Sequence, residues 1–274
     1  MKIRLETGGL TLVADLSTAI DISIPLTFDG EQPNCFGAPR ATRESLRVGD
    51  WVGDTHHDGS CNVDVYRLTP HCNGTHTECV GHIVHDDVFA AETVRGGLYP
   101  ATLITVEPMT QAHARETTSP DPAPADRMIT ALAIKRALEQ WPESVMRSAL
   151  IIRTTPNPES KAMREYHADD PPPFLSMEAA RLLVEMNVQH VLVDVPSLDR
   201  MADEGHLSAH HIFFGLPSGA RDARAASRAH CTVTELIYVP DEIPDGYYLL
   251  DLQMPSFMTD AAPSRPLLYQ VQTQ

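Results

Sequence analysis

Six side chains that can bind a transition metal or carry a proton lie within residues 69–84. They are His71, Cys72, His76, Glu78, Cys79 and His82. Imidazole, carboxylate and thiol groups are the usual protein ligands of transition metals, and imidazole and carboxylate carry protons in many enzymes. A histidine-rich segment on its own also fits a solvated surface loop. The density of such groups here favours an active site.

The spacing of these residues predicts how they are held. His76 and Glu78 are two positions apart, which places both on one face of an extended segment. Cys72 and His82 continue the same even-numbered register. Gly74 permits a sharp turn, and the proline, asparagine and threonine residues around it disfavour a helix. We therefore expect an extended or looped segment in which four donor groups converge.

The segment resembles the signature of a known family. Aligned on the Gly-Thr-His triplet at 74–76, it is similar to the pattern His-x-Gly-Thr-His-x-Asp-x-Pro-x-His of the cyclase-like metal-dependent hydrolases, the family of bacterial kynurenine formamidase and isatin hydrolase. His82 matches the last histidine. Cys72 stands where the pattern has its first histidine, Glu78 where it has aspartate, and Val80 where it has proline.

Further matches, in the family's order, extend this resemblance along nearly the whole chain. They lie at 15–17, 149–154, 194–199, 209–215, 234–236 and 254–266. Several ordered matches are more specific than one motif. The resemblance implies one domain over residues 1–274, a swivelling β/β/α cyclase-like fold with a mixed β-sheet core and flanking helices, and a homodimer or homotetramer.

The resemblance also implies a metal centre of one or two ions per chain, either Zn²⁺ or Mn²⁺. Carried over position by position, its ligands are Cys72, His76, Glu78, His210 and Glu235. A thiolate at position 72 favours zinc over manganese. Two altered ligand positions are also compatible with a lost metal. His71, His211 and His230 are alternative ligands that the sequence leaves open.

In the family His82 corresponds to the acid/base residue, which takes a proton from a metal-bound water and returns it to the leaving nitrogen. The predicted activity is hydrolysis of a carbon–nitrogen bond in a small amide substrate. N-formylkynurenine, in tryptophan catabolism, or a related aryl amide or lactam is the family-level expectation. Two alternatives stay open: a metal-free, catalytically silent ligand-binding homologue, and a cyclase or dehydratase acting on a polyketide-like ring.

Other polar and aromatic residues have a functional and a structural interpretation. Asp194 and Asp199 are best explained as residues that cap or brace the end of a strand. Four aromatic side chains could stack on an aromatic substrate, although packing explains each equally well. They are Phe36, Trp51, Tyr166 and Phe174.

Composition excludes several classes of partner. A formal net charge of −16 disfavours nucleic acid, because phosphate binding relies on clustered Lys and Arg. Five cysteines, an odd number in a chain too long to need covalent staples, favour reduced thiols in the cytoplasm. No segment reaches the ~20 apolar residues of a membrane helix, and the first residues do not form a signal-peptide run. We expect a cytoplasmic protein without a membrane or nucleic-acid partner.

Hydrophobic patterning alone predicts a mixed α/β protein. Short runs rich in Val, Ile, Leu and Thr predict strands at 10–14, 101–106, 149–152, 191–195 and 235–239. Apolar residues at helical spacing predict helices at 128–141 and 176–186, the second with Ser176 as its N-cap.

Overall fold

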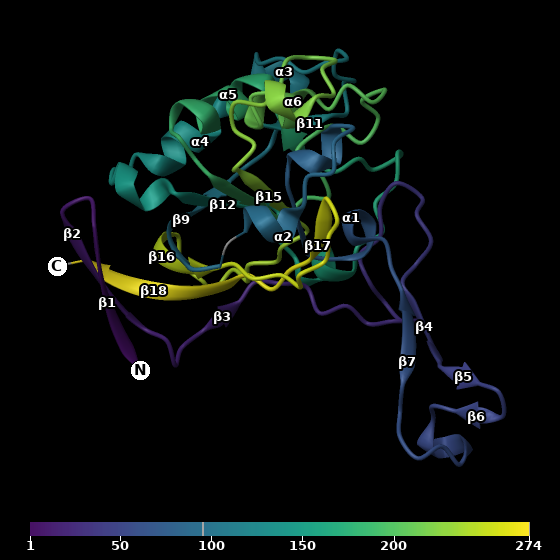
Figure 1. Cartoon of the computed structure of the whole chain (residues 1–274). Coiled ribbons are helices and arrows are strands. Elements are labelled where there is room, and N and C mark those ends of the chain that lie inside the picture. The colour runs from purple at the N-terminus through teal and green to yellow at the C-terminus, as the bar shows by residue number, and fades with distance from the viewer. Residues whose placement is uncertain (95, 274) are drawn as a thin grey trace.

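The computed structural model describes residues 1–94 and 96–273 and is organised around a large mixed β-sheet (Figure 1). Within these residues the sheet has eleven strands. From edge to edge they are β1 (Lys2–Thr7), β2 (Leu10–Asp15), β18 (Leu267–Thr273), β16 (Gly246–Asp251), β9 (Leu98–Val106), β12 (Ala149–Thr154), β14 (His190–Val193), β15 (Thr232–Glu235), β8 (His76–Glu78) and β17 (Ala261–Pro263), and β3 (Ile20–Asp21) pairs with β18. The predicted α/β class is confirmed.

The centre of the sheet is parallel. Strands β9, β12, β14 and β15 run in the same direction, and β8 joins β15 in the opposite direction. Every residue of β12 is buried. Parallel strands covered on both faces are continuous apolar runs, which is the pattern that predicted this strand. The strands expected at 10–14, 101–106, 149–152 and 191–195 are confirmed.

The strand expected at 235–239 is wrong. Strand β15 ends at Glu235, because Leu236 has a φ of 54°, in the left-handed region that interrupts a strand. Leu236, Ile237 and Val239 are buried in two hydrophobic clusters, so their apolar character reflects core packing. The turn leaves Glu235 as the last residue of the strand.

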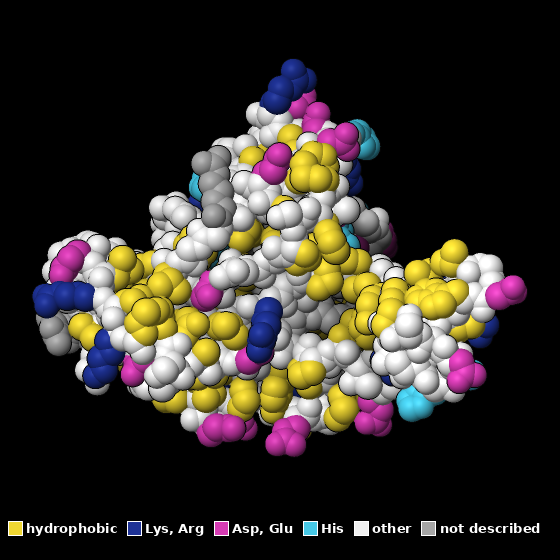
Figure 2. All heavy atoms as spheres, turned by 60° about the horizontal axis from the view of Figure 1, so that its bottom comes forward, with side chains coloured by type: hydrophobic (Ala, Val, Ile, Leu, Met, Phe, Trp, Pro, Cys, Tyr) yellow, Lys and Arg dark blue, Asp and Glu magenta, His cyan; other side chains and the backbone are white. Residues whose placement is uncertain are grey.

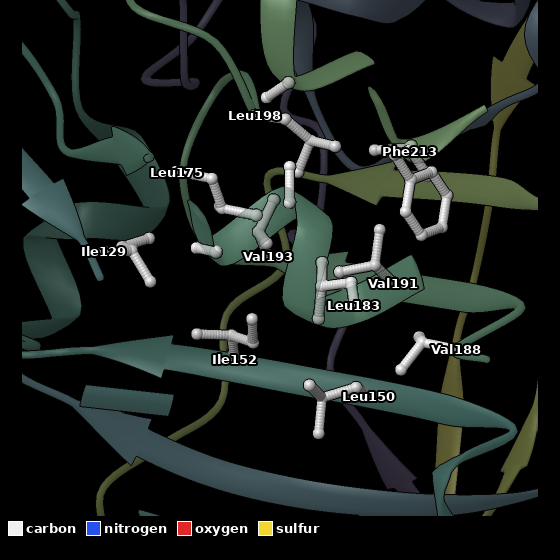
Figure 3. Close-up of a cluster of buried hydrophobic side chains, with 14 of the residues drawn as sticks. Ile129, Leu150, Ile152, Leu175, Leu183, Val188, Val191, Val193, Leu198 and Phe213 are labelled. Atoms are coloured by element: carbon white, nitrogen blue, oxygen red, sulfur yellow. The ribbon is translucent and has the colours of Figure 1, made fainter. Parts of the chain in front are cut away.

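Helices cover one face of the sheet (Figure 1). They are α4 (Ala131–Leu138), α5 (Met177–Glu185) and α6 (Ser208–Phe213). Ile152 and Val191 of the central strands pack with Leu183 of α5 in the largest buried cluster (Figure 3). This packing fixes α6, which carries His210, over the end of the sheet where Glu235 lies.

The helix predicted at 176–186 is confirmed as α5, and the Ser176 hydroxyl caps it by accepting a hydrogen bond from the Ala179 amide at 2.9 Å. The helix predicted at 128–141 is partly wrong. Its first residues form β11 (Arg127–Ile129), which pairs with β10 (Met109–Thr110) and β13 (Phe174–Leu175). Thr130 caps α4 at its true start.

An arm of residues 42–67 projects from the body (Figure 1). It contains β4 (Thr42–Ser45) and β7 (Asp64–Arg67), with β5 (Arg47–Val48), β6 (Trp51–Val52) and the 3₁₀ helix η1 (Thr55–His57) toward its tip. The remaining elements are short. They are α1 (Pro70–Asn73), α2 (Ala90–Thr93), α3 (Gln111–Ala114), η2 (Val80–Ile83), η3 (Ser144–Arg147), η4 (Glu159–Met163) and η5 (Ala223–Ala225).

The surface agrees with the acidic composition. Asp and Glu side chains are scattered over the face that Figure 2 presents. In the part of the chain that the structure describes, no helix has the length and apolar character needed to cross a bilayer.

Candidate metal centre

Strand pairing at the edge of the sheet brings the two halves of the predicted site together. Strand β8 lies between β15 and β17, both antiparallel to it. His76 is the register partner of Glu235, so their side chains emerge on the same face. The Nε2 atom of His76 lies 3.4 Å from Oε2 of Glu235.

The segment before and after β8 differs from the sequence expectation. Only His76–Glu78 is extended, whereas Pro70–Asn73 forms the helical turn α1 and Val80–Ile83 the 3₁₀ turn η2. Proline is tolerated at the first position of a helix because its missing N–H has no partner there. The even-numbered register is therefore wrong for Cys72 and His82, which lie on these turns.

Two fully buried histidines face the carboxylates of the site. His76 donates from Nδ1 to the Gly74 carbonyl at 3.0 Å and turns Nε2 toward Glu235. His210 contacts Asp199 through Nδ1 at 2.6 Å and Glu78 through Nε2 at 2.8 Å. The same His210 nitrogen lies 3.6 Å from Glu235.

Two partly exposed histidines complete the cluster. His71 lies 3.0 Å from Oε2 of Glu78 through Nδ1 and 3.0 Å from Oδ2 of Asp260 through Nε2. His82 lies 3.9 Å from the same Glu78 oxygen through Nε2 and 3.4 Å from Asp260 through Nδ1. The two rings are stacked with their centroids 4.2 Å apart.

All four imidazoles follow one rule. In each ring one nitrogen, the outer nitrogen, lies against the Gly74 carbonyl or the carboxylate of Asp199 or Asp260. The other, the inner nitrogen, points at Glu78 or Glu235. Metal-binding histidines in proteins have this arrangement, because the outer acceptor fixes the tautomer and the orientation of the ring.

The nitrogen and oxygen atoms at the centre of the cluster are better arranged to bind a cation than to form hydrogen bonds with one another. The Nε2 atom of His76 and Oε2 of Glu78 are buried and make no hydrogen bond among the described residues, although nitrogen or oxygen atoms lie 3.0–3.4 Å away. Buried polar atoms without partners are costly. Two sets of potential ligand atoms can be distinguished, and in each set the atoms lie within 4.8 Å of one another. Both sets contain Glu78, one with His71 and His82 and the other with His76 and Glu235.

The electrostatics show a site built to compensate buried negative charge. Burial opposes ionisation of Glu78, but neighbouring His82 and His210 outweigh it and hold the pKa of this carboxyl well below its usual value. Burial opposes the charge on His210 as well, and the adjacent carboxylates, Glu78 first, raise its pKa well above the usual value. Burial opposes the charge on His71 too, and the carboxylates of Asp260 and Glu78, each 3.0 Å from a ring nitrogen, outweigh it and raise its pKa to about 10. A bound cation would replace these protons, because metal ligands must be deprotonated.

Cys72, the first of the expected ligands, belongs to neither set of ligand atoms. Its side chain is buried in a separate cluster with Tyr166 and Leu236. A hydrogen bond from the Cys35 thiol lowers the pKa of the Cys72 thiol to about 7. The structure therefore brings together His76, Glu78, His82, His210 and Glu235, and leaves Cys72 beside them.

Of the alternative ligands, only His71 reaches the centre. His211 contacts the Leu216 carbonyl through Nδ1 and Arg221 through Nε2. His230 precedes β15 and therefore lies toward the opposite end of this strand from Glu235.

Two residues at the site were not predicted as functional. Asp199 was interpreted as structural, and it does cap α6 through the amides of Ala209 and His210, but it also fixes the His210 ring. Asp260 lies far from the signature in the sequence. The only signal for it was the family-like tail at 254–266, which does not single out this carboxylate.

Fold and site together define a mixed-sheet α/β protein with a buried histidine–carboxylate centre. The family described as Putative cyclase matches residues 14–200, well over half of the chain. The chain belongs to this family, which confirms the expected membership. No curated protein matches the chain.

Solved structures agree with this assignment. A predicted metal-dependent hydrolase from Bacillus stearothermophilus is 19% identical, with a TM-score of 0.56, covering 92% of this chain and 98% of that one. An isatin hydrolase bound to the product analogue thioisatinate is 15% identical, with a TM-score of 0.61 and coverage of 93% and 92%. Isatin hydrolase A from Labrenzia aggregata is 16% identical, with a TM-score of 0.59 and coverage of 93% and 94%. These similarities confirm the cyclase-like fold.

Proposed function

We propose that this protein is a metal-dependent hydrolase that cleaves the carbon–nitrogen bond of a small amide. The observation that carries the proposal is the common orientation of four imidazoles, whose outer nitrogens are held and whose inner nitrogens face two buried carboxylates. Membership of the cyclase family and the metal-dependent hydrolase among its structural neighbours support it.

The residues that would hold Zn²⁺ or Mn²⁺, as one or two ions per chain, are His76, Glu78, His210 and Glu235. Bound there, a cation supplies Lewis-acid polarisation of the substrate carbonyl and lowers the pKa of a coordinated water. Glu235 is itself fixed, because its Oε1 accepts a hydrogen bond from the Leu198 amide at 2.8 Å. The site thus binds and orients the reacting groups with side chains that have little freedom to move.

His82 is the proposed acid/base residue. Its side chain is 28% exposed, so its ring reaches both the buried carboxylate of Glu78 and solvent. With Nδ1 turned to Asp260, Nε2 is the atom that takes a proton from the attacking water and returns it to the leaving nitrogen.

The proposed substrate is an aryl amide or a lactam, with N-formylkynurenine as the family-level candidate. The two isatin hydrolases among the structural neighbours support a cyclic aryl amide. Of the four aromatic candidates, Tyr166 and Phe174 are buried and pack in the core. Phe36 is 49% exposed and follows Cys35, whose thiol lies 3.5 Å from the His71 carbonyl, so it is the best placed to contact a substrate.

The test combines metal analysis with product analysis. The purified chain is supplemented with Zn²⁺ or Mn²⁺, its metal content is measured, and isatin and N-formylkynurenine are assayed for ring opening and for release of formate. Metal near one or two equivalents with hydrolysis of either compound supports the proposal. Absence of metal after supplementation points to the ligand-binding alternative, and ring closure of a polyketide-like substrate without amide hydrolysis points to the cyclase.

We also propose a homodimer or homotetramer in the cytoplasm, acting on a small molecule without a nucleic-acid or membrane partner. Exposed apolar residues on the arm, Val48, Val63 and Tyr66, support contact with another copy. All five cysteines are free, which supports a reducing compartment. Light scattering of the full chain tests the assembly, and a monomer at micromolar concentration would contradict it.

A further inference from the structure

Position 72 is where the chain departs from the family signature. The thiol of Cys72 does not join the ligand atoms of the site. Instead it shares a buried cluster with Cys35, and Ile24 and Leu236 pack in the same cluster. The cluster is apolar and lies behind the turn that carries the signature. The position that should supply a ligand therefore supplies a core residue.

The neighbouring residue His71 has the orientation that Cys72 lacks. Both residues lie on α1, and successive side chains on a helical turn point about 100° apart. When Cys72 faces the core, His71 therefore faces β8, where Nδ1 lies 3.0 Å from Oε2 of Glu78. The His71 side chain is 24% exposed, so it lies on the side of the site that is open to solvent.

Asp260 holds this orientation. Its backbone carbonyl accepts a hydrogen bond from the Cys79 amide at 3.1 Å, and the next residue pairs with Glu78 across β17 and β8. Gly81 allows the close approach, since a Cβ there would lie 2.2 Å from the Val88 carbonyl and 3.1 Å from the Cβ of Asp260. The carboxylate is thus fixed by backbone pairing beside the two partly exposed histidines, His71 and His82.

One oxygen of Asp260 serves both rings. Oδ2 lies 3.0 Å from Nε2 of His71 and 3.4 Å from Nδ1 of His82. With these outer nitrogens held, Nδ1 of His71 and Nε2 of His82 are left facing the buried Oε2 of Glu78. Tetrahedral zinc with ligands at about 2.0–2.2 Å needs neighbouring ligand atoms roughly 3.3 Å apart. The separation of 3.0 Å between Nδ1 of His71 and Oε2 of Glu78 is close to that value.

We propose that His71, positioned by Asp260, is the metal ligand that takes the place of Cys72. This inference rests on the proposed metal-dependent function and assigns one of its ligands. Asp260 is a positioning residue, because it acts on the metal through the two imidazoles. The ligand set then contains only nitrogen and oxygen, so the thiolate argument for zinc over manganese no longer applies.

Cobalt spectroscopy of the 274-residue chain tests whether the thiol is a ligand. A thiolate bound to Co²⁺ gives an intense near-ultraviolet charge-transfer band, and imidazole and carboxylate ligands do not. We expect Co²⁺ to bind with visible d–d bands and without the thiolate band, and the spectrum to be unchanged in Cys72→Ser. A thiolate band that disappears in Cys72→Ser would overturn the proposal.

Metal affinity, measured by competition with a chelator, tests the two residues separately. Asp260→Asn is expected to weaken binding roughly 10–100-fold, the usual size for an outer partner of a ligating histidine. His71→Ala is expected to weaken it further, and Cys72→Ser to leave it within about twofold. Unchanged affinity in His71→Ala would overturn the proposal, as would a loss in Cys72→Ser that exceeds the loss in His71→Ala.

Asp21→Asn is the matched control. Asp21 has a side-chain exposure of 38%, close to the 39% of Asp260, and is paired with a cationic side chain, Arg265, but neither residue belongs to the two sets of potential ligand atoms. Asp260→Glu, which keeps the carboxylate, should recover part of the affinity. Circular dichroism of the metal-free variants separates unfolding from ligand loss. If the unsubstituted chain binds no Co²⁺, the proposed function fails together with this inference, whereas binding through a thiolate overturns this inference alone.

Discussion

The two sides of the metal centre are built differently. The buried side consists of His76, Glu78, His210 and Glu235, whose side chains are 0–4% exposed. The open side consists of His71, His82 and Asp260, whose side chains are 24–39% exposed. The buried residues lie on strands β8 and β15 and helix α6, and the open ones on two short turns and the residue before β17.

This difference separates two tasks. Side chains mounted on packed strands and helices are held more precisely than those on turns, as a metal site requires. Proton transfer and substrate binding require access to solvent, which the open side has. We therefore expect substitutions on the buried side to remove the metal, and substitutions on the open side to act first on turnover or to weaken the metal in part.

The largest effect is expected from His76→Ala on the buried side. Loss of this imidazole removes a proposed ligand and leaves Glu235 buried without its neighbour. The variant should lose metal and with it all measurable hydrolysis. Elemental analysis after supplementation and isothermal titration with Zn²⁺ measure both effects.

His190→Ala is the control for this substitution. His190 is also a buried histidine, but it begins β14 and contacts Thr232 at the start of β15, the opposite end from Glu235. Metal retained in full by His76→Ala would break the comparison, because it would place the cation outside the buried side.

The next effect is expected from His82→Ala on the open side. The variant should keep its metal and lose roughly 10²–10⁴-fold in turnover, the usual contribution of general acid–base catalysis. Turnover at saturating substrate and metal content are measured on the same preparation. His85→Ala, at an exposed histidine three residues away, should leave both unchanged. Metal loss equal to that of His76→Ala would assign His82 to the ligands instead.

Most of the sheet was predictable because its strands are decided by burial. The run at 149–152 is apolar on both faces, and no other element accommodates such a short buried run so well. The errors at the ends of elements arose where tertiary contacts determine the secondary structure. Residues 127–129 are compatible with a helix, but pairing with β10 and β13 makes them a strand. Residues 236–239 have strand composition, but the left-handed Leu236 interrupts the regular strand.

The site was predictable in part for the same reason. Positions 76, 78, 210 and 235 follow from a motif and from elements that the sheet places together. The exchange of roles between positions 71 and 72 depends on one helical turn, which the proline and glycine content argued against. Asp260 reaches the site only through the pairing of β17 with β8. No spacing rule along the chain contains that information.

A smaller effect is expected from Asp199→Asn, which removes the charge behind His210. Asparagine can still accept the Ala209 amide through its one oxygen, whereas its NH₂ group replaces the oxygen that accepts from both the backbone amide and the ring of His210. Metal affinity should fall roughly 10–100-fold, while turnover at saturating metal changes little. A fall in turnover with unchanged affinity would show that the buried side takes part in proton transfer, contrary to the separation of tasks.

The smallest effect concerns the metal-free protein and its response to pH. The pKa of His71 is raised to about 10 in the folded chain, against about 6.5 in the unfolded one. A raised folded-state pKa contributes stability that is complete below pH 6.5 and is lost as the pH rises toward 10. The melting temperature of the metal-free chain should therefore fall across this range, more steeply than that of His71→Gln.

Adding metal tests whether this fall of the melting temperature with pH arises from the metal site. A bound cation replaces the proton on His71, so the metal-loaded chain should lose the difference in slope from its variant. Each kcal/mol corresponds to roughly 2–4 °C in domains of 150–250 residues, so thermal unfolding at several pH values resolves the effect. Parallel curves for the metal-free chain and His71→Gln would mean that the open side is not held by its carboxylates, and the contrast between the two sides would then rest on exposure alone.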